Sequence, residues 1–319
     1  MAFHPGPRPA APRRLTPSRA LRAPRAIALL GLVAPALSGC GPSRDPAPSA
    51  EYVAMGSSYA AGPGVGSRAE GSPFLCARSS ANYAHLVAAA LRLTLRDVTC
   101  SGATIDNILV KRQAHRAPQI NAIGPKTRLV TITVGGNDVS YLGNLAGESC
   151  ANAKSRVPWF WRPVVCSVTP QDKVEAAFKA LPGHLTAMVE AVHRLAPDAR
   201  VVLVDYVTVL PTSGTCVDRA PLSATQIAAG NAVAQRLADA TAAAARLSGA
   251  TLVKASAVTK GHDVCATDPW LFGFVFPASP FSWGPFSYHP NAQAMRAVAD
   301  AVLAALKGGP PAASGGATR

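Results

Sequence analysis

The chain has 319 residues, of which 49% are hydrophobic and 15% are charged, a balance too apolar for a protein that is disordered throughout. Its 31 Lys and Arg residues against 17 Asp and Glu residues give a net charge of +14. The basic residues form no run of five and no patch interleaved with aromatic side chains, which disfavours a nucleic-acid-binding protein.

An export signal is predicted at the N-terminus. Residues 1–25 are rich in Pro and Arg, and the apolar stretch Ala26–Leu37 suits the core of a signal peptide but is too short to span a bilayer. It ends in Leu37-Ser38-Gly39-Cys40, which resembles the bacterial lipoprotein box, in which the Cys becomes the lipidated first residue. We therefore expect a lipoprotein-type signal peptide over 1–39 and lipidation of Cys40. An ordinary secretory signal cleaved nearby is the alternative.

Low-complexity segments set the limits of the predicted domain. Residues 40–50, rich in Pro and Ser, are typical of a flexible tether, and residues 307–319, rich in Gly, Pro and Ala, of a disordered tail. Residues 51–306 between them are expected to form one domain. Six basic residues lie in the leader, so the chain from Cys40 onward keeps 25 basic and 17 acidic groups, a net charge of +8. This excess favours attraction to anionic lipid or polysaccharide over nucleic acid, and a generally solvated basic surface is the simplest interpretation.

Short aliphatic runs and helical stripes alternate along this domain. The predicted strands are Tyr52–Met55, Leu95–Val98, Leu129–Val134, Val201–Tyr206 and Thr251–Val253. The predicted helical stripes lie within Tyr83–Leu91, Leu185–Val192 and Ile227–Thr241. Ser223 is the expected N-cap of the third helix, and Pro290 is placed in the first turn of a last helix that runs to Leu306. Strands that alternate with helices predict an α/β fold with a parallel sheet covered on both faces.

Six cysteines follow Cys40, and an even number behind an export signal predicts three disulfides in an oxidising compartment. Six cysteines allow 15 pairings. Pairing neighbours along the chain closes three separate loops, so the predicted disulfides are Cys76–Cys100, Cys150–Cys166 and Cys216–Cys265. No two cysteines stand two to four residues apart, and no histidine pair at helical spacing lies near them, which disfavours a metal site.

Four polar segments lie at the predicted carboxyl ends of strands or just before the last helix, where open α/β sheets bind ligands. Gly56-Ser57-Ser58 stands at a strand-to-helix turn that can expose a hydroxyl among free N–H groups. Cys100-Ser101-Gly102 can present a backbone N–H, and Gly135-Gly136-Asn137 ends in an amide that can donate to an oxyanion. Tyr288-His289-Pro290 places an imidazole before the last helix. Taken singly, each segment has a plainer interpretation as a turn, a cap or a packing residue.

In the order Ser, Gly, Asn and His, these segments resemble the four blocks of the SGNH (GDSL-type) hydrolase family, over essentially the whole domain. The cysteine pattern is similar to that of secreted actinobacterial lipases and esterases of the family with three disulfides. The resemblance implies a three-layer α/β/α fold with a parallel five-stranded sheet of the flavodoxin-like kind. It also implies a serine ester hydrolase that uses no metal and no cofactor.

The resemblance implies a role for each matching residue. Ser58 would be the nucleophile and His289 the base, with the oxyanion held by the N–H groups of Ser58 and Gly102 and by the Asn137 amide. Ser57 stands where the family usually has Asp, so either serine could react, and position in the motif favours Ser58.

The last block also departs from the family pattern. Phe286 replaces the Asp that usually precedes the histidine by three residues. Some relatives orient the histidine with a backbone carbonyl there, so the Phe286 carbonyl is the expected partner of His289. Asp263 or Asp268 could instead supply the missing charge.

Two apolar loops predict a substrate site or a membrane-facing lip. They are Val157–Trp161 and Leu271–Phe286, the second with Phe272, Phe274, Phe276, Phe281 and Trp283. A satellite hydrophobic cluster is the alternative.

The expected protein is an exported, monomeric, lipid-anchored enzyme of the cell envelope that cleaves lipidic or simple carboxylic esters through an acyl-serine intermediate. The alternatives are an O-acyl esterase acting on envelope polysaccharide and a non-catalytic lipid-binding lipoprotein.

Overall fold

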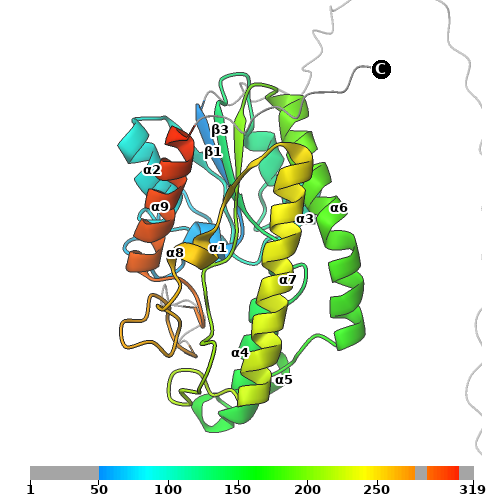
Figure 1. Ribbon diagram of the computed structural model, residues 1–319, viewed down its shortest axis with the longest axis vertical. Helices are drawn as coiled ribbons and strands as arrows, with labels where there is room; N and C mark the ends of the chain where they lie inside the picture. The colour runs from blue at the N-terminus through cyan, green and yellow to red at the C-terminus, as the bar shows by residue number, and fades with distance from the viewer. Residues whose placement is uncertain (1–49, 277–285, 309–319) are drawn as a thin grey trace, which may run out of the picture. The chain divides into compact units, whose positions relative to one another are not determined.

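A parallel five-stranded sheet forms the centre of the domain (Figure 1). The computed structural model describes residues 50–276 and 286–308, so the leader, Cys40, Phe281, Trp283 and the tail from 309 lie outside the described residues. The strands are β1 (Tyr52–Gly56), β2 (Leu95–Asp97), β3 (Leu129–Thr133), β4 (Arg200–Val204) and β5 (Thr251–Val253). Their order is β2-β1-β3-β4-β5, all parallel, which is the flavodoxin-like order. The predicted strands and fold class are confirmed.

Helices cover both faces of this sheet, which explains why β1 and β3 are buried along their whole length. The helices α2 (Tyr83–Leu91) and α9 (Ala292–Lys307) pack together on one face (Figure 1). The helices α3 (Ile105–Leu109), α6 (Gln171–Leu195) and α7 (Ala224–Ser248) lie together on the other. The predicted α6 stripe is buried, and the Ser223 side chain accepts from the Gln226 N–H at 3.2 Å as the N-cap of α7.

The last helix begins two residues later than Pro290, so the prediction that Pro290 lies in its first turn is wrong. The Asn291 side chain accepts hydrogen bonds from the N–H groups of Gln293 and Ala294, at 3.0 and 3.2 Å. Asn291 is therefore the N-cap, because it satisfies donors that the first turn leaves free. Pro290 precedes the cap and pairs with Leu271 in an isolated bridge.

Several short elements were not predicted, because they are too short or too rich in glycine to show a period. They are α1 (Ser58–Ala61), α4 (Tyr141–Asn152), α5 (Arg162–Val165), α8 (Ala255–Val258) and the 3-10 turns η1 (Phe74–Cys76), η2 (Gln119–Ala122) and η3 (Lys154–Arg156). Gly147 in α4 lets the backbone after α5 come close, since an added Cβ would lie 2.2 Å from the Ser167 carbonyl oxygen.

Three disulfides hold excursions of the chain away from the sheet. They join Cys76 to Cys100, Cys150 to Cys166 and Cys216 to Cys265, the pairs expected from the sequence. The second closes the loop between α4 and the end of α5. Three disulfides are typical of a protein exported to an oxidising compartment. None of the helices in the described part of the chain combines the length and the hydropathy of a membrane span.

The C-terminal end of α9 is held by Arg200 of β4. Its guanidinium donates to the carbonyl oxygens of Ala305 at 2.7 Å and Leu306 at 2.8 Å. Replacing it (Arg200→Ala) should lower the free energy of unfolding by about 2 kcal/mol, because charged donors to the carbonyl oxygens of the last helical turn are lost. Urea denaturation measures this loss. The exposed Arg296→Ala on the same helix is the control and should change stability by less than about 0.5 kcal/mol. Equal effects of the two variants would contradict the capping role.

Candidate active site

The turn from β1 into α1 presents Ser58 to a cavity. Gly56 has φ +131°, and an added Cβ there would lie 2.3 Å from the Thr133 carbonyl oxygen, so only glycine allows β1 and β3 this approach. The Ser57 N–H donates to the same carbonyl at 2.8 Å and fixes the turn. Ser58 is the first residue of α1. Its backbone N–H has no acceptor among the residues that the structure describes.

The two serines of this turn face different surroundings. The Ser57 side chain is buried, and its Oγ lies 3.2 Å from the Tyr206 hydroxyl. That hydroxyl also accepts from the Gly136 N–H at 2.9 Å. Gly136 permits the contact, since a Cβ there would lie 2.6 Å from the tyrosine ring. Ser57 is therefore part of the structure that ties together the ends of the central strands, while Ser58 reaches the cavity.

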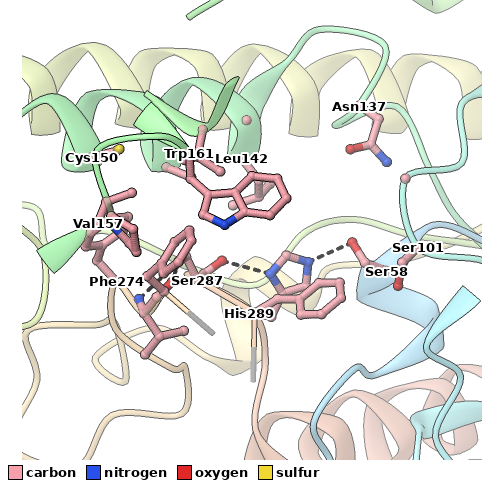
Figure 2. A pocket seen from close by; sticks show the side chains of 18 of the residues that line it. Ser58, Ser101, Asn137, Leu142, Cys150, Val157, Trp161, Phe274, Ser287 and His289 are labelled. Carbon is pink, nitrogen blue, oxygen red and sulfur yellow. Dashed lines mark hydrogen bonds between the residues drawn. The ribbon is translucent and has the colours of Figure 1, made fainter. Parts of the chain in front are cut away.

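His289 lies between the Ser58 hydroxyl and the Ser287 carbonyl (Figure 2). Its Nε2 is 2.7 Å from Ser58 Oγ, and its Nδ1 is 2.8 Å from the Ser287 carbonyl oxygen. A carbonyl can only accept, so Nδ1 carries the proton and donates it to Ser287. Nε2 is then free to accept from the Ser58 hydroxyl, which is the arrangement that a serine needs in order to lose its proton to a base.

The prediction that the Phe286 carbonyl orients His289 is wrong. The Phe286 carbonyl oxygen instead accepts the backbone N–H of His289 at 3.2 Å, and the two rings meet edge to face at 5.5 Å. Tyr288 has φ +63° and so reverses the chain immediately before the histidine. The Tyr59 hydroxyl donates to the Tyr288 carbonyl at 2.6 Å and helps to hold this conformation. The turn brings the carbonyl of Ser287, rather than that of Phe286, to the imidazole.

The predicted alternative of a distant carboxylate is also wrong. Asp263 accepts the Cys265 N–H at 2.8 Å, and Asp268 accepts the Trp270 indole N–H at 3.0 Å. Neither carboxylate has a hydrogen bond or an ion pair to His289. Both are used to organise the loop that follows α8.

Burial keeps the histidine neutral. Desolvation lowers the pKa of His289 to about 4 from its ordinary value of 6.5, and the hydrogen bond to Ser287 acts in the opposite direction with a smaller effect. Near neutral pH the imidazole is therefore uncharged and able to accept a proton. A carboxylate partner would raise this pKa, because it would stabilise the charged ring.

Gly102 and Asn137 lie on the same cavity as Ser58. Gly102 has φ +79°, and its N–H has no acceptor within the described part of the chain. The loop before it is held by Gln113, whose side chain donates to the Ser101 carbonyl at 2.8 Å. The Asn137 amide donates to the Ala103 carbonyl at 2.9 Å, which fixes its position with one of its two hydrogens. The three residues expected to supply donors to an oxyanion thus line one cavity, and Figure 2 shows Ser58 and Asn137 on the same side of it.

The rest of the cavity, about 510 Å³ in volume, is walled by apolar side chains (Figure 2). The two predicted loops contribute Val157, Pro158, Phe160, Trp161, Phe274, Phe276 and Phe286. The wall prediction is confirmed for these residues, whereas Phe272 and Trp159 do not line the cavity. One face of α4, which the sequence did not reveal, contributes Leu142, Gly143, Ala146 and Cys150.

The sequence reading missed Tyr206, Gln113 and Ser287. Tyr206 contacts the site through its buried hydroxyl, Gln113 through its side-chain amide and Ser287 through its backbone carbonyl. No local sequence motif marks such contacts. Within residues 50–276 and 286–308, no group of three His, Cys, Asp or Glu side chains is placed to hold a metal ion.

One family model and several known proteins are similar to this chain over most of its length. Residues 54–297 match the model of the GDSL-like lipase/acylhydrolase family. Lipase 2 of Streptomyces coelicolor is 32% identical over 302 residues, covering 88% of this chain and 95% of that protein.

Two solved structures are similar as well. Phospholipase A1 of Streptomyces albidoflavus NA297 has a TM-score of 0.63 and 27% identity, covering 82% of this chain and 99% of that one. The extracellular lipase of Streptomyces rimosus has a TM-score of 0.61 and 28% identity, covering 81% and 98%.

The burial of His289 has a measurable consequence. In an NMR titration its imidazole should change from neutral to charged with a midpoint near pH 4, because the buried ring resists protonation until the solution is strongly acidic. His289→Gln identifies its resonance, and circular dichroism over the same range confirms that the chain stays folded. A midpoint near the ordinary value of 6.5 would show that the ring is solvated.

Proposed function

The chain belongs to the GDSL-like lipase/acylhydrolase family and is a carboxylic ester hydrolase, and we propose that Ser58 and His289 carry out the reaction on esters of apolar acyl chains. The observation that carries this proposal is the hydrogen bond of 2.7 Å between Ser58 Oγ and His289 Nε2, two residues that line a largely apolar cavity. The named lipases and the phospholipase A1 to which the chain is similar support lipidic esters as its substrates.

The proposed reaction begins with attack of Ser58 Oγ on the ester carbonyl carbon while His289 Nε2 takes the hydroxyl proton. The tetrahedral intermediate carries its negative charge on the former carbonyl oxygen. Collapse breaks the ester C–O bond, and the alcohol leaves with the proton from His289, which yields an acyl-serine. A water molecule then gives its proton to His289 and attacks the acyl carbon, and Ser58 departs with that proton as the acid is released.

The oxyanion is assigned to the N–H groups of Ser58 and Gly102 and to the remaining amide hydrogen of Asn137. The two backbone donors have no acceptor of their own in the described residues, so they do not give up a protein hydrogen bond when the charge develops. Fixed donors in a site of low dielectric stabilise such a charge more than water does. Each donor contributes on the order of a hundredfold to the rate.

The acyl chain is assigned to the apolar part of the cavity. The small residues Gly143, Ala146 and Cys150 recur at helical spacing along one face of α4 and leave the wall of the cavity smooth. They extend over about 10 Å along the helix axis. The aromatic side chains Trp161 and Phe274 lie on the same cavity (Figure 2). A long apolar wall suits a fatty acyl group better than the acetyl group of a sugar ester.

The location of the enzyme is proposed from the sequence. Three disulfides support export, and Leu37-Ser38-Gly39-Cys40 supports attachment of a lipid to Cys40. We place the enzyme as a monomer on the cell envelope, where the anchor would keep it at a lipid surface. Mass spectrometry of the exported chain tests this placement, since an N-terminus at Cys40 without a lipid would contradict it.

Hydrolysis of nitrophenyl esters tests the roles of the two serines. Ser58→Ala and His289→Ala should each lower kcat by about a thousandfold or more, because the nucleophile or its base is lost. Ser57→Ala should stay within about tenfold of the parent, since Ser57 Oγ contacts Tyr206 rather than the cavity. A large loss in Ser57→Ala with little loss in Ser58→Ala would reverse the assignment. No turnover by the folded parent chain would favour a non-catalytic lipid-binding protein.

Gly143 tests the acyl site. A Cβ at this position meets no other atom within 4 Å, so a larger side chain can project into the cavity without disturbing the helix. Gly143→Leu should lower kcat/KM for nitrophenyl decanoate by about tenfold or more and leave the acetate within about threefold. Gly183→Leu is the control, because this exposed glycine of α6 has the same open space and does not line the cavity. An equal loss on both esters would show that the acyl chain lies elsewhere.

A further inference from the structure

A large apolar surface is exposed beside the cavity, and some of its residues also line the cavity. We call it the α5 face, and it consists of Trp159, Phe160, Trp161, Val164, Val165 and Val168. Trp159 is 76% exposed, Phe160 58% and Val164 68%, fractions that are unusual for such large apolar side chains standing together. The three aromatic rings touch in sequence, Trp159 against Phe160 at 5.9 Å and Phe160 against Trp161 at 6.1 Å between ring centres.

The α5 face is continuous with the cavity that contains Ser58 and His289. Phe160, Trp161 and Val165 belong to both, since each is exposed and also lines the cavity. An acyl chain that leaves an apolar phase over the α5 face would therefore enter the cavity without crossing a polar rim on this side. An apolar cluster that only covered the core would have no reason to share residues with the cavity lined by Ser58 and His289.

The segment that forms the α5 face carries only positive charges. Lys154, Arg156 and Arg162 lie in or beside it, and the sequence holds no Asp or Glu between Glu148 and Asp172. An apolar surface that carries aromatic side chains, and whose own segment of the sequence bears only cations, is complementary to an anionic lipid headgroup layer above an acyl region. A protein partner that buried the same surface would have to bring its own acidic side chains.

The α5 face is held in place before any partner arrives. The disulfide Cys150–Cys166 ties the end of α5 to α4. The Arg162 guanidinium donates to the Val157 carbonyl at 2.9 Å, and the Arg156 guanidinium donates to the Asp218 carbonyl at 2.9 Å. Binding would therefore cost little in ordering the loop, and the aromatic side chains need not be gathered first.

We propose that the α5 face docks on the surface of an anionic phospholipid bilayer, with Trp159, Phe160 and Val164 inserted at the level of the headgroups and the acyl chain of a lipid ester drawn into the cavity beside them. The second part of this proposal, that docking delivers a lipid ester to Ser58, rests on the proposed function. The docking itself does not require catalysis, so the two can fail separately.

Sedimentation with vesicles tests the docking. The full exported chain carries Cys40→Ala, so that no lipid anchor contributes, and Ser58→Ala, so that the vesicles are not consumed. It should bind vesicles of phosphatidylcholine and phosphatidylglycerol in equal parts at least about tenfold more tightly than vesicles of phosphatidylcholine alone. Equal binding to both vesicles, or binding to neither, would overturn the proposal.

Point variants locate the contact. Val164→Asp and Trp159→Ala, neither of which lines the cavity, should weaken binding to the anionic vesicles by about tenfold or more, because inserted apolar area is lost. Leu247→Asp on α7 is the control, since Leu247 is 68% exposed, as Val164 is, but lies outside the α5 face. Weakening by Leu247→Asp as strong as that by Val164→Asp would show that the membrane does not contact α5.

The charge contribution has its own pair of variants. Lys154→Glu should weaken binding to anionic vesicles by about tenfold, while Lys126→Glu, an equal change of charge placed before β3, should leave it within about twofold. If both variants weaken binding equally, only the net charge of the chain matters and the α5 face is not the docking surface.

Two further readouts separate the remaining outcomes. With Ser58 restored, Val164→Asp should keep its turnover of soluble nitrophenyl acetate and lose hydrolysis of esters embedded in anionic vesicles. No turnover of the soluble ester by the parent would refute the proposed function and leave the docking result standing. A dimer in gel filtration that Trp159→Ala dissociates would assign the α5 face to a second copy of the chain and overturn the membrane proposal.

Discussion

One hydrogen-bonded line of three groups, Ser58 Oγ, the His289 imidazole and the Ser287 carbonyl, organises the candidate active site, and the proposed reaction depends on it. The carbonyl holds the ring in the tautomer that leaves Nε2 as the acceptor, and it does so without a formal charge. A buried carboxylate in its place would have to be desolvated as well as paired. The neutral partner leaves the desolvation of the imidazole largely uncompensated, which is why its pKa falls to about 4. The Ser287 carbonyl therefore orients the His289 ring but leaves it a weaker base than a carboxylate partner would.

The fold brings segments that are far apart in the sequence together at these three groups. Ser58 and His289 are 231 residues apart, and they meet because β1 ends where the loop before α9 returns to the same edge of the parallel sheet. Tyr206 ties this edge together, since its hydroxyl contacts both Ser57 after β1 and the Gly136 N–H after β3. The position of the turn that carries Ser58 therefore depends on a buried tyrosine to which the proposed reaction assigns no role.

The substrate side is built in a different way. The sheet and its large helices do not form the apolar walls of the cavity, which come from α4, from the loop closed by Cys150–Cys166 and from the segment that contains Phe274. Such loops bury too little apolar surface to be stable alone, and the disulfide restricts their unfolded states. Among the described residues, neither the apolar walls of the cavity nor the exposed α5 face uses a residue of the five strands.

The sequence by itself predicted the five strands, the helices α2, α6, α7 and α9, the three disulfide pairs and the segments that meet at the site. Hydrophobic periodicity, an even number of cysteines and the four motifs around Ser58, Gly102, Asn137 and His289 depend only on residue type and on spacing along the chain. They can therefore be recognised without the tertiary structure. Only the tertiary structure decided that Ser287 orients the histidine, that Asn291 caps the last helix and that α4 lines the cavity. These outcomes depend on the directions in which carbonyls and helix faces point. A single positive φ at Tyr288, held by the hydrogen bond from the Tyr59 hydroxyl to the Tyr288 carbonyl, turns the chain and so brings the Ser287 carbonyl rather than that of Phe286 to the imidazole.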